Sequence, residues 1–263
     1  MKLTTKAVEK VWGRRDLPSP FATPGSEPVG EIWFEPPPEL PQILIKYLFT
    51  GEKLSVQVHP SDAKAPSGSR GKEECWLVLD AEPGATLAIG FKEFVTPEAM
   101  RAAALDGSIE DLLAWHPVKS GDFFYLPAGT VHAIGPGLTL VEVQQNSDIT
   151  YRLYDYGRPR ELHLNEGVAV ARGAPYPERY RRHIDADAEV TLVDGPHFRF
   201  SQVTGEPSAE TAARHEGALL VLPLDRQVLI AGEAIAAGEC GMAASVEVVD
   251  FASAGRTLLV SGV

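Results

Sequence analysis

The sequence is poor in the features that mark secreted and membrane-spanning proteins. Its two cysteines, Cys75 and Cys240, are too few for a disulfide framework and fit a reducing compartment in which both thiols are free. No apolar run approaches the roughly 18 residues that cross a bilayer, and the N-terminal stretch has no apolar segment typical of a secretory signal. These absences predict a cytoplasmic protein with no membrane partner.

Positive charge is also scarce, because 24 lysines and arginines stand against 36 acidic residues, for a net charge of −12. Nucleic-acid binding needs clustered cations that neutralise phosphates, so this balance predicts no nucleic-acid partner. A general acidic excess keeps a protein soluble without indicating a function. A small anionic substrate stays compatible with the charge if the site itself gathers cations.

The chain has ample apolar material, with 44% hydrophobic residues among 263, enough for one large or two modest domains. Apolar and polar residues alternate in short segments separated by Gly, Pro and Asp turns, which is typical of β-strands. The predicted strands are 29–34, 43–49, 54–59, 75–79, 123–126, 138–143 and 150–154. The fold class is therefore predicted to be mainly β.

One block, around 96–116, is predicted to be a helical insertion. Thr96 can cap a helix, Pro97 suits the first helical position, and Ser108 can cap a second short helix. Residues 155–182 are polar and irregular, and short β-patterned runs recur beyond them, so we place a domain boundary near residue 183. The prediction is a larger domain over 1–182 and a smaller C-terminal β-sandwich or half-barrel over 183–263.

Two polar side chains share one face of the predicted strand 54–59. Leu54, Val56 and Val58 alternate with polar positions, so Gln57 and His59 point the same way. Pro60 lacks a backbone donor and ends the strand there. A buried histidine with a hydrogen-bonding neighbour is the structural alternative to a ligand role.

Further along the chain, Glu74 lies where a loop becomes a strand, and His132 follows the turn 127–130. Taken with Gln57 and His59, these residues offer two imidazoles, a carboxylate and an amide, which suit a divalent metal with a position open for substrate. Zinc is the favoured ion, although iron, manganese, cobalt and nickel also accept such ligands. A solvated charge run is the structural alternative for Glu74.

For several other side chains the sequence predicts burial, packing or exposure. Lys46 interrupts an apolar run and is expensive to bury unless it is paired or faces a cavity. Cys75 is expected to point into the core, away from Glu74. His116 is expected to be structural. The remaining histidines are expected to be exposed, namely His163, His183, His197 and His215.

Several motifs together resemble type I mannose-6-phosphate isomerase in its short bacterial form, a member of the cupin superfamily. The motifs are VQVHP at 56–60, KEECW at 72–76, PAGTVHAI at 127–134 and DITYR at 148–152, supported by WG at 12–13, GEIW at 30–33 and LIK at 44–46. The resemblance runs through about residues 7–172. The C-terminal part fits loosely, because the family's apolar, proline-containing run appears here as GMAAS at 241–245.

The resemblance implies a cupin, a jelly-roll β-barrel, as the catalytic domain over 1–182, with a smaller cupin-like domain over 183–263. It implies one Zn²⁺ per chain, held by Gln57, His59, Glu74 and His132. It also implies that Arg152 is catalytic and that the substrate is bound by Lys72, Arg152, Lys46, Trp12 and Glu142.

The implied reaction interconverts mannose 6-phosphate and fructose 6-phosphate by proton transfer between C1 and C2, through an enediol-like intermediate. It places the chain in carbohydrate metabolism, including GDP-mannose synthesis, as a monomer or weak homo-oligomer that acts on a sugar phosphate. The general base stays open between Glu142 and a metal-bound water. The alternatives are an iron-dependent cupin oxygenase, against which the Lys72 and Arg152 pair counts, and a non-catalytic sugar-phosphate-binding cupin, against which the complete ligand set counts.

Overall fold

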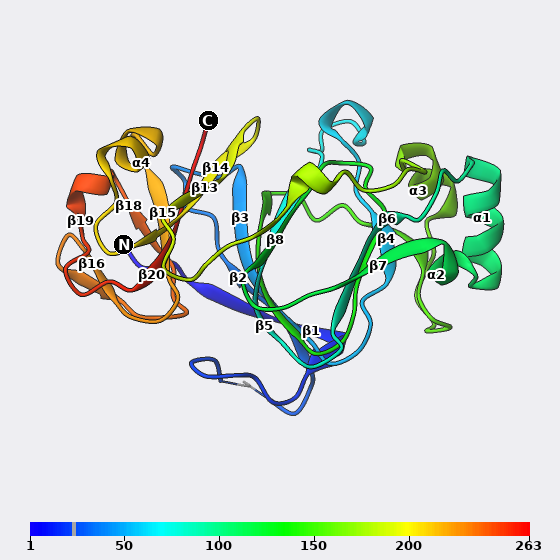
Figure 1. The fold of residues 1–263 in the computed structure, drawn as a ribbon, viewed down its shortest axis with the longest axis horizontal. Helices are drawn as coiled ribbons and strands as arrows, with labels where there is room; N and C mark the ends of the chain where they lie inside the picture. The colour runs from blue at the N-terminus through cyan, green and yellow to red at the C-terminus, as the bar shows by residue number, and fades with distance from the viewer. Residues whose placement is uncertain (23–24) are drawn as a thin grey trace.

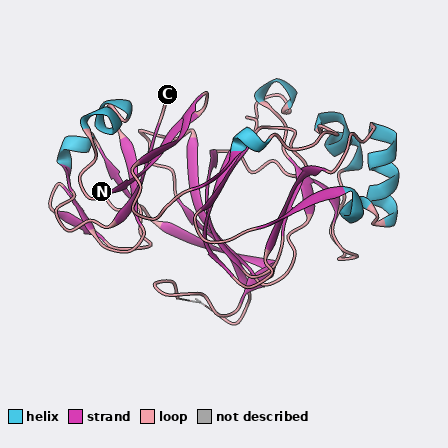
Figure 2. Cartoon of the chain, in the orientation of Figure 1, coloured by secondary structure: helices cyan, strands magenta, loops and turns pink. Residues whose placement is uncertain are grey.

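The computed structural model describes residues 1–22 and 25–263, and its architecture is mainly β, as predicted (Figures 1 and 2). The largest sheet has seven strands and every pairing in it is antiparallel. In sheet order these are β1 (Thr5–Arg14), β2 (Val29–Phe34), β3 (Ile43–Thr50), β10 (Leu138–Gln145), β5 (Glu74–Ala81), β8 (Asp122–Leu126) and β12 (Arg181–His183).

A second sheet packs against the first and encloses the inner core of the larger part of the chain. Its five strands, in sheet order, are β11 (Tyr151–Tyr154), β4 (Val56–Val58), β9 (His132–Ile134), β6 (Thr86–Phe91) and β7 (Leu113–Pro117). Side chains of both sheets, such as Trp76 and Val78 from β5 and Leu87 and Ile89 from β6, form one buried cluster. Full burial of such side chains stabilises the fold by about 1.5–3 kcal/mol each.

The outer face of the second sheet is covered by helices, seen at the right of Figure 1. These are α1 (Pro97–Asp106), α2 (Ile109–Leu112) and α3 (Leu164–Val170). Val56 and Val58 of β4 pack into this outer cluster with Met100 of α1. Since side chains alternate along a strand, Gln57 is left on the opposite, inward face.

The C-terminal part forms two further antiparallel sheets, at the left of Figure 1. The first comprises β13 (Val190–Gly195), β14 (Phe198–Thr204), β20 (Arg256–Ser261), β15 (Leu219–Pro223) and β18 (Gly241–Ala243). The second comprises β17 (Glu233–Ile235), β16 (Val228–Ile230) and β19 (Val249–Asp250), and α4 (Ala209–Arg214) lies near them. Short 3₁₀ turns complete the chain at η1 (Asp62–Lys64), η2 (Glu178–Tyr180) and η3 (Val246–Val248).

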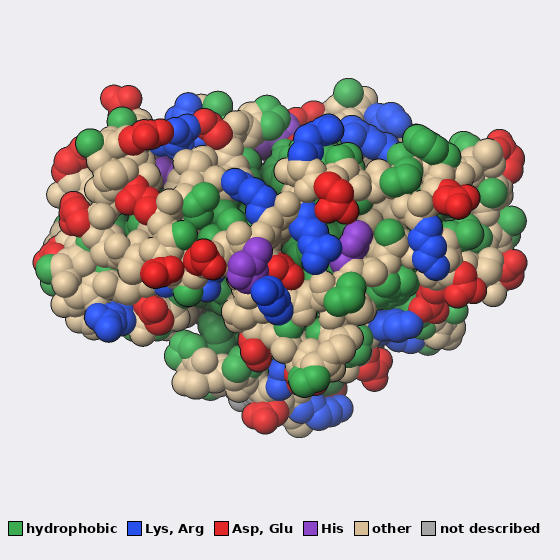
Figure 3. Space-filling model, in the orientation of Figure 1, with side chains coloured by type: hydrophobic (Ala, Val, Ile, Leu, Met, Phe, Trp, Pro, Cys, Tyr) green, Lys and Arg blue, Asp and Glu red, His purple; other side chains and the backbone are tan. Residues whose placement is uncertain are grey.

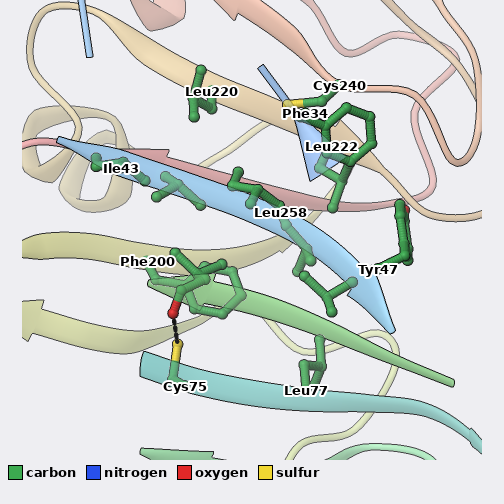
Figure 4. Close-up of a cluster of buried hydrophobic side chains, with 14 of the residues drawn as sticks. Phe34, Ile43, Tyr47, Cys75, Leu77, Phe200, Leu220, Leu222, Cys240 and Leu258 are labelled. Atoms are coloured by element: carbon green, nitrogen blue, oxygen red, sulfur yellow. Dashed lines mark hydrogen bonds between the residues drawn. The ribbon is translucent and has the colours of Figure 1, made fainter. Parts of the chain in front are cut away.

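One hydrophobic cluster joins the seven-stranded sheet to the C-terminal sheet. Figure 4 shows Tyr47 and Leu77 from the first facing Phe200 and Leu258 from the second. Cys75 is fully buried in this cluster and points away from Glu74, as expected, and both cysteines are free. Along the chain, β12 is the last strand of the first two sheets, and β13 is the first strand of the C-terminal sheets. The division into two domains near residue 183 stays a prediction.

The helical insertion was predicted too long. Leu113–Pro117 is a strand, because Trp115 and His116 pair with Ala88 and Leu87 of β6. Thr96 does cap α1, accepting from the Ala99 backbone N–H, but Ser108 makes no capping bond and its hydroxyl donates to Asp106 Oδ1. The short helices α3 and α4 were not predicted.

No helix among the described residues is long and apolar enough to cross a membrane. On the face drawn in Figure 3, acidic and basic side chains are intermixed across the surface.

Candidate metal centre and adjoining pocket

Strand alternation brings the predicted ligands to one place between the two inner sheets. Glu74 and Trp76 of β5 face inward, whereas Cys75 faces outward. Gln57 of β4 is in direct register with His132, the first residue of β9. The strand that holds Gln57 ends at Val58, one residue earlier than predicted, and His59 follows it directly.

Three of the four predicted ligands form a group that could hold a metal ion, and they are His59, Glu74 and His132. All three are at most 2% exposed, and their ligand atoms lie within 4.8 Å of one another. Nε2 of His132 is 3.3 Å from Glu74 Oε1, and Nε2 of His59 is 3.6 Å from Glu74 Oε2. The structure therefore brings these side chains together, while their role as ligands stays a prediction.

The hydrogen bonds of the two imidazoles define their tautomers. Nδ1 of His59 lies 2.7 Å from the Ile149 carbonyl, and Nδ1 of His132 lies 2.9 Å from the Thr130 carbonyl. A carbonyl only accepts, so each Nδ1 carries the proton and each Nε2 presents a lone pair toward Glu74. Metal-ligating histidines are oriented in this way by their second nitrogen.

The protonation states agree with this arrangement. Burial, followed by the charge of Lys72, lowers the pKa of His59 well below its ordinary value. Burial lowers the pKa of His132 to about 4. Both imidazoles are therefore neutral near pH 7 and able to ligate.

Glu74 provides the test of whether the residues fit a metal. Its oxygens are buried, and neither accepts a hydrogen bond of good geometry, although Lys72 Nζ lies 2.8 Å from Oε2. Burial raises the pKa of Glu74 above its ordinary range even though Lys72 opposes the shift. A buried carboxylate that lacks full hydrogen bonding and faces two imidazole lone pairs fits a divalent cation.

Gln57 completes the predicted set from the side of β4. Its Nε2 lies 3.2 Å from His132 Nε2, and its Oε1 accepts a hydrogen bond from the Ser55 hydroxyl at 3.2 Å. The amide group is thus at the predicted place beside the histidine.

The predicted substrate residues line a pocket of about 370 Å³ next to this centre. Its walls include Trp12, Lys46, Gln57, Lys72, Glu142 and Arg152, together with Lys6, Lys10, Glu31, Trp33, Trp76, Asp148, Thr150 and Arg160. Six lysines and arginines face three carboxylates here, although the whole chain is acidic. The pocket therefore gathers the cations that an anionic ligand needs.

Lys72 lies at the boundary between the pocket and the metal centre. Its Nζ is 3.3 Å from His59 Nε2 and 3.8 Å from Glu142 Oε1. Burial works against its charge, but Glu142 and Glu74 outweigh that effect and raise the pKa of Lys72 above its usual value. A charged ammonium is therefore fixed beside the candidate ligands.

Glu142 is bound tightly by its neighbours. Its Oε1 accepts from Lys46 Nζ at 3.0 Å, and its Oε2 accepts from Trp76 Nε1 at 2.9 Å. Burial disfavours its charge, but Lys72 and Lys46 outweigh burial and lower the pKa of Glu142 below its ordinary range. So weak a base is poorly matched to proton abstraction.

Arg152 reaches the pocket from β11, opposite Gln57 in the strand register. One guanidinium nitrogen donates to the Glu161 carbonyl at 2.7 Å, while its buried Nε has no hydrogen-bond partner among the described residues. Burial and then Arg160 lower the pKa of Arg152, which remains protonated in practice. An incompletely bonded arginine is suited to contacting a ligand.

Sequence reasoning missed several pocket residues. Lys6 and Lys10 share one face of β1 with Trp12 and line the same cavity, a period-two signal that was available in the sequence. Glu31 and Trp33 were not among the predicted pocket residues, but Trp33 Nε1 donates to Glu31 Oε2 at 2.6 Å in the pocket wall.

The other histidines correct the expectation of exposure at three of four positions. His215 is fully buried rather than exposed, bonded to Ser261 and Ser201, and His163 and His197 are half-buried. His183 is exposed, as predicted. His116 packs against Phe124 and Tyr176, in line with a structural role.

The two facing sheets, with inward histidines and a carboxylate, form a fold of the cupin type with a candidate metal centre. The sequence is also similar to those of curated relatives. The chain is 42% identical over 168 residues to mannose-6-phosphate isomerase ManA of Bacillus subtilis, covering 59% of this chain and 53% of that protein. It is 45% identical over 136 residues to mannose-6-phosphate isomerase of Streptococcus mutans, covering 49% and 43%.

Solved structures agree over the whole chain. A crystal structure of mannose 6-phosphate isomerase from Bacillus subtilis matches with a TM-score of 0.75 at 25% identity, covering 100% of this chain and 99% of that one. A zinc-bound mannose 6-phosphate isomerase matches in fold with a TM-score of 0.73 at 16% identity, covering 99% and 98%. The resemblance and the fold class predicted from the sequence are thereby confirmed.

The chain spans about half the length of the curated relatives it matches. No protein-family model matches the chain.

Proposed function

We propose that the chain is a zinc-dependent aldose–ketose isomerase that interconverts mannose 6-phosphate and fructose 6-phosphate. The observation that supports this most is the convergence of two imidazole lone pairs on the buried, incompletely bonded Glu74, beside a pocket lined by cations. The relatives' names supply the reaction, and the pocket chemistry is compatible with a phosphorylated sugar.

In this proposal His59, Glu74, His132 and Gln57 hold one zinc ion per chain. When bound, the ion supplies positive charge that polarises the sugar's carbonyl and hydroxyl oxygens. Lys72 donates to the same end of the sugar, since its ammonium lies at the junction of the ligands and the cavity.

Arg152 has an electrostatic role in the proposal. The isomerisation moves a proton between C2 and C1, and negative charge develops on the oxygens of both carbons. A guanidinium with a free buried N–H stabilises that charge without losing its own proton. Lys46 holds Glu142 in place, and Trp12 forms part of the pocket wall.

A coupled assay on mannose 6-phosphate, with metal analysis of the same sample, tests the proposal. Chelation should abolish turnover, and added zinc should restore it. Full activity of the stripped protein would contradict the zinc requirement. Oxygen uptake with iron, or tight binding of fructose 6-phosphate without turnover, would instead support the oxygenase or the non-catalytic alternative.

Variants separate the two parts of the site. His132→Ala should lose zinc, because an imidazole ligand is removed. Arg152→Ala should keep zinc and lose about 10²–10³-fold in kcat, the usual effect of removing one charge-stabilising donor. Loss of zinc from Arg152→Ala would contradict its assignment to the substrate pocket. The cytoplasmic location, the monomeric or weakly oligomeric state and the link to GDP-mannose synthesis stay predictions.

A further inference from the structure

A single loop, residues 60–71, connects His59 to Lys72 and Glu74. Its base is closed by the Lys72 backbone N–H, which donates to the Pro60 carbonyl at 2.9 Å. Within the loop, next to this base, the Gly71 backbone N–H donates to Asp62 Oδ1 at 2.7 Å. Because His59 precedes the loop and Glu74 follows it, the loop's two ends set the spacing between two candidate ligands.

Gln145, the last residue of β10, connects both ends of this loop. Its Nε2 lies 3.2 Å and 3.3 Å from the two oxygens of Asp62, and its Oε1 accepts from the Glu73 backbone N–H at 2.9 Å. Its own backbone N–H donates to the Glu73 carbonyl at 3.0 Å. Gln145 is 5% exposed, so its side of these bonds is shielded from water, whereas the Asp62 side chain is 54% exposed.

The segment that starts at Gln145 also orients His59. The Ile149 carbonyl accepts the His59 Nδ1 proton, and the Ser147 hydroxyl donates to the Arg70 carbonyl at 3.0 Å. The side chain of Gln144 donates to the carbonyls of Gln145 and Ser147, both at 2.7 Å, which fixes the turn between them. The same short segment thus bonds to the loop and to a candidate ligand.

We propose that Asp62 and Gln145 form a positioning pair that sets the geometry of His59 and Glu74 toward a divalent cation without touching it. Outer-shell groups that orient ligands typically contribute about 10–100-fold to metal affinity. The inference rests on the proposed metal centre and adds residues that the sequence motifs did not indicate.

The chemistry of the pair allows a reciprocal exchange. Gln145→Glu removes the amide donor and sets a carboxylate against Asp62, so the pair repels. Asp62→Asn keeps an acceptor for the Gly71 N–H and adds a donor. In the double variant the amide introduced at position 62 donates to the carboxylate introduced at position 145. The second oxygen of that carboxylate still accepts from the Glu73 N–H, so the connection is restored with its direction reversed.

The experiment measures zinc affinity by competition with a chromophoric chelator, and the visible spectrum of the cobalt-substituted protein. Gln145→Glu should weaken affinity about 10–100-fold and alter the cobalt spectrum. The double variant should recover most of the affinity and the wild-type spectrum. Asp106→Ala is the matched control, since it removes an acceptor of two hydrogen bonds from Ser108 in another turn and should leave affinity unchanged.

Unchanged affinity in Gln145→Glu, or a double variant no better than Gln145→Glu, would overturn the inference. If Gln145→Glu fails to fold, Asp62→Ala replaces it, because the Asp62 side chain is 54% exposed and its loss spares the core. That variant should lower zinc affinity at a nearly unchanged Tm, and wild-type affinity would overturn the proposal. Absence of zinc binding by the wild-type protein would overturn the proposed function itself.

Discussion

Gln57 and His132 face each other across the antiparallel pair β4 and β9, and their Nε2 atoms lie 3.2 Å apart. The orientation of the amide follows from its bonds, because Ser55 donates to Gln57 Oε1. A half-turn of the amide would place its oxygen beside His132, and the Ser55 hydroxyl can accept as well as donate. Gln57 therefore has one orientation that donates to His132 Nε2 and another whose oxygen would be satisfied only by a cation beside His132.

This adaptable amide should be the weakest member of the ligand set. In Gln57→Leu the group of His59, Glu74 and His132 remains, so zinc should still bind, with an affinity about 10–100-fold lower, as for loss of a supporting group. Metal content and a competition titration measure the change. Ser55→Ala is the control and should have a smaller effect. Complete zinc loss from Gln57→Leu, equal to that of His132→Ala, would show that Gln57 is an essential ligand.

Alternation along strands made much of the site predictable from the sequence. The alternation around Gln57 and His59 predicted that they share a face, and in the structure this face meets Glu74 and His132. What period-two patterning cannot give is which strands are neighbours. The register of Glu142 opposite Lys46, and its bond to Trp76, depend on the sheet order, which brings together residues far apart in the chain.

The errors have tertiary causes, which the local sequence does not contain. Leu113–Pro117 continues a helical-looking block, but pairing with β6 makes it a strand, so tertiary contact overrides local propensity. His215 lies among polar neighbours in sequence yet is buried, because two serines from different strands satisfy both ring nitrogens. The Asp62–Gln145 contact joins residues too far apart in sequence for spacing to reveal it.

The buried ion pair between Lys46 and Glu142 gives a prediction about stability. Both side chains are 5% exposed, and if Lys46 were replaced Glu142 would keep its bond from Trp76 and the more distant cation Lys72. Lys46→Met should lower the free energy of unfolding by about 3–5 kcal/mol, because one partner of a buried ion pair is removed and the Glu142 charge is left incompletely compensated. Urea denaturation measures this. The exposed pair Lys2 and Glu239 is the control, where Lys2→Met should change stability far less than Lys46→Met does.

Adding Glu142→Gln should recover part of the loss in Lys46→Met, because the uncompensated charge is then removed. If the double variant loses at least as much free energy of unfolding as the two single variants together, the uncompensated charge of Glu142 is not the cause of the loss in Lys46→Met.

Two glycines of the loop 60–71 should respond differently to alanine. A Cβ at Gly71 would lie 2.4 Å from the backbone nitrogen of Asp62, so the base of the loop must shift. Gly68 has a φ of +82° with open space around it, so alanine there meets only backbone strain. Gly71→Ala should cost about 1–3 kcal/mol from crowding and also weaken zinc binding. Gly68→Ala should cost about 1–2 kcal/mol and leave zinc binding intact.

Thermal unfolding and a zinc titration of the two glycine variants measure these effects. If both variants lose stability and zinc affinity in the same proportion, the base of the loop has no special connection to the metal centre.

His215 should make stability depend on pH. Its side chain is 0% exposed, and its ring nitrogens lie 2.8 Å from the Ser201 hydroxyl and 2.9 Å from the Ser261 hydroxyl. Burial, and then Arg199 and Arg214, lower the pKa of His215 to about 4. The native state therefore keeps this imidazole neutral at a pH where the unfolded chain already binds a proton.

The sign follows from that difference in proton binding. Above about pH 6.5 neither state is protonated at His215, and its contribution to stability is complete. As the pH falls from about 6.5 to about 4, the unfolded state gains a proton that the native state lacks, so the free energy of unfolding should fall by up to about 3 kcal/mol. Urea denaturation of metal-free protein across this range measures the slope.

His215→Gln is the matched variant, because glutamine is polar and does not titrate. Whatever its absolute stability, its free energy of unfolding should fall less steeply with decreasing pH than that of the wild type. Both proteins retain His59 and His132, so the contributions of these two residues cancel in the comparison. Equal slopes in the two proteins would mean that burial does not hold His215 neutral, because only a difference in proton binding between folded and unfolded states makes stability depend on pH.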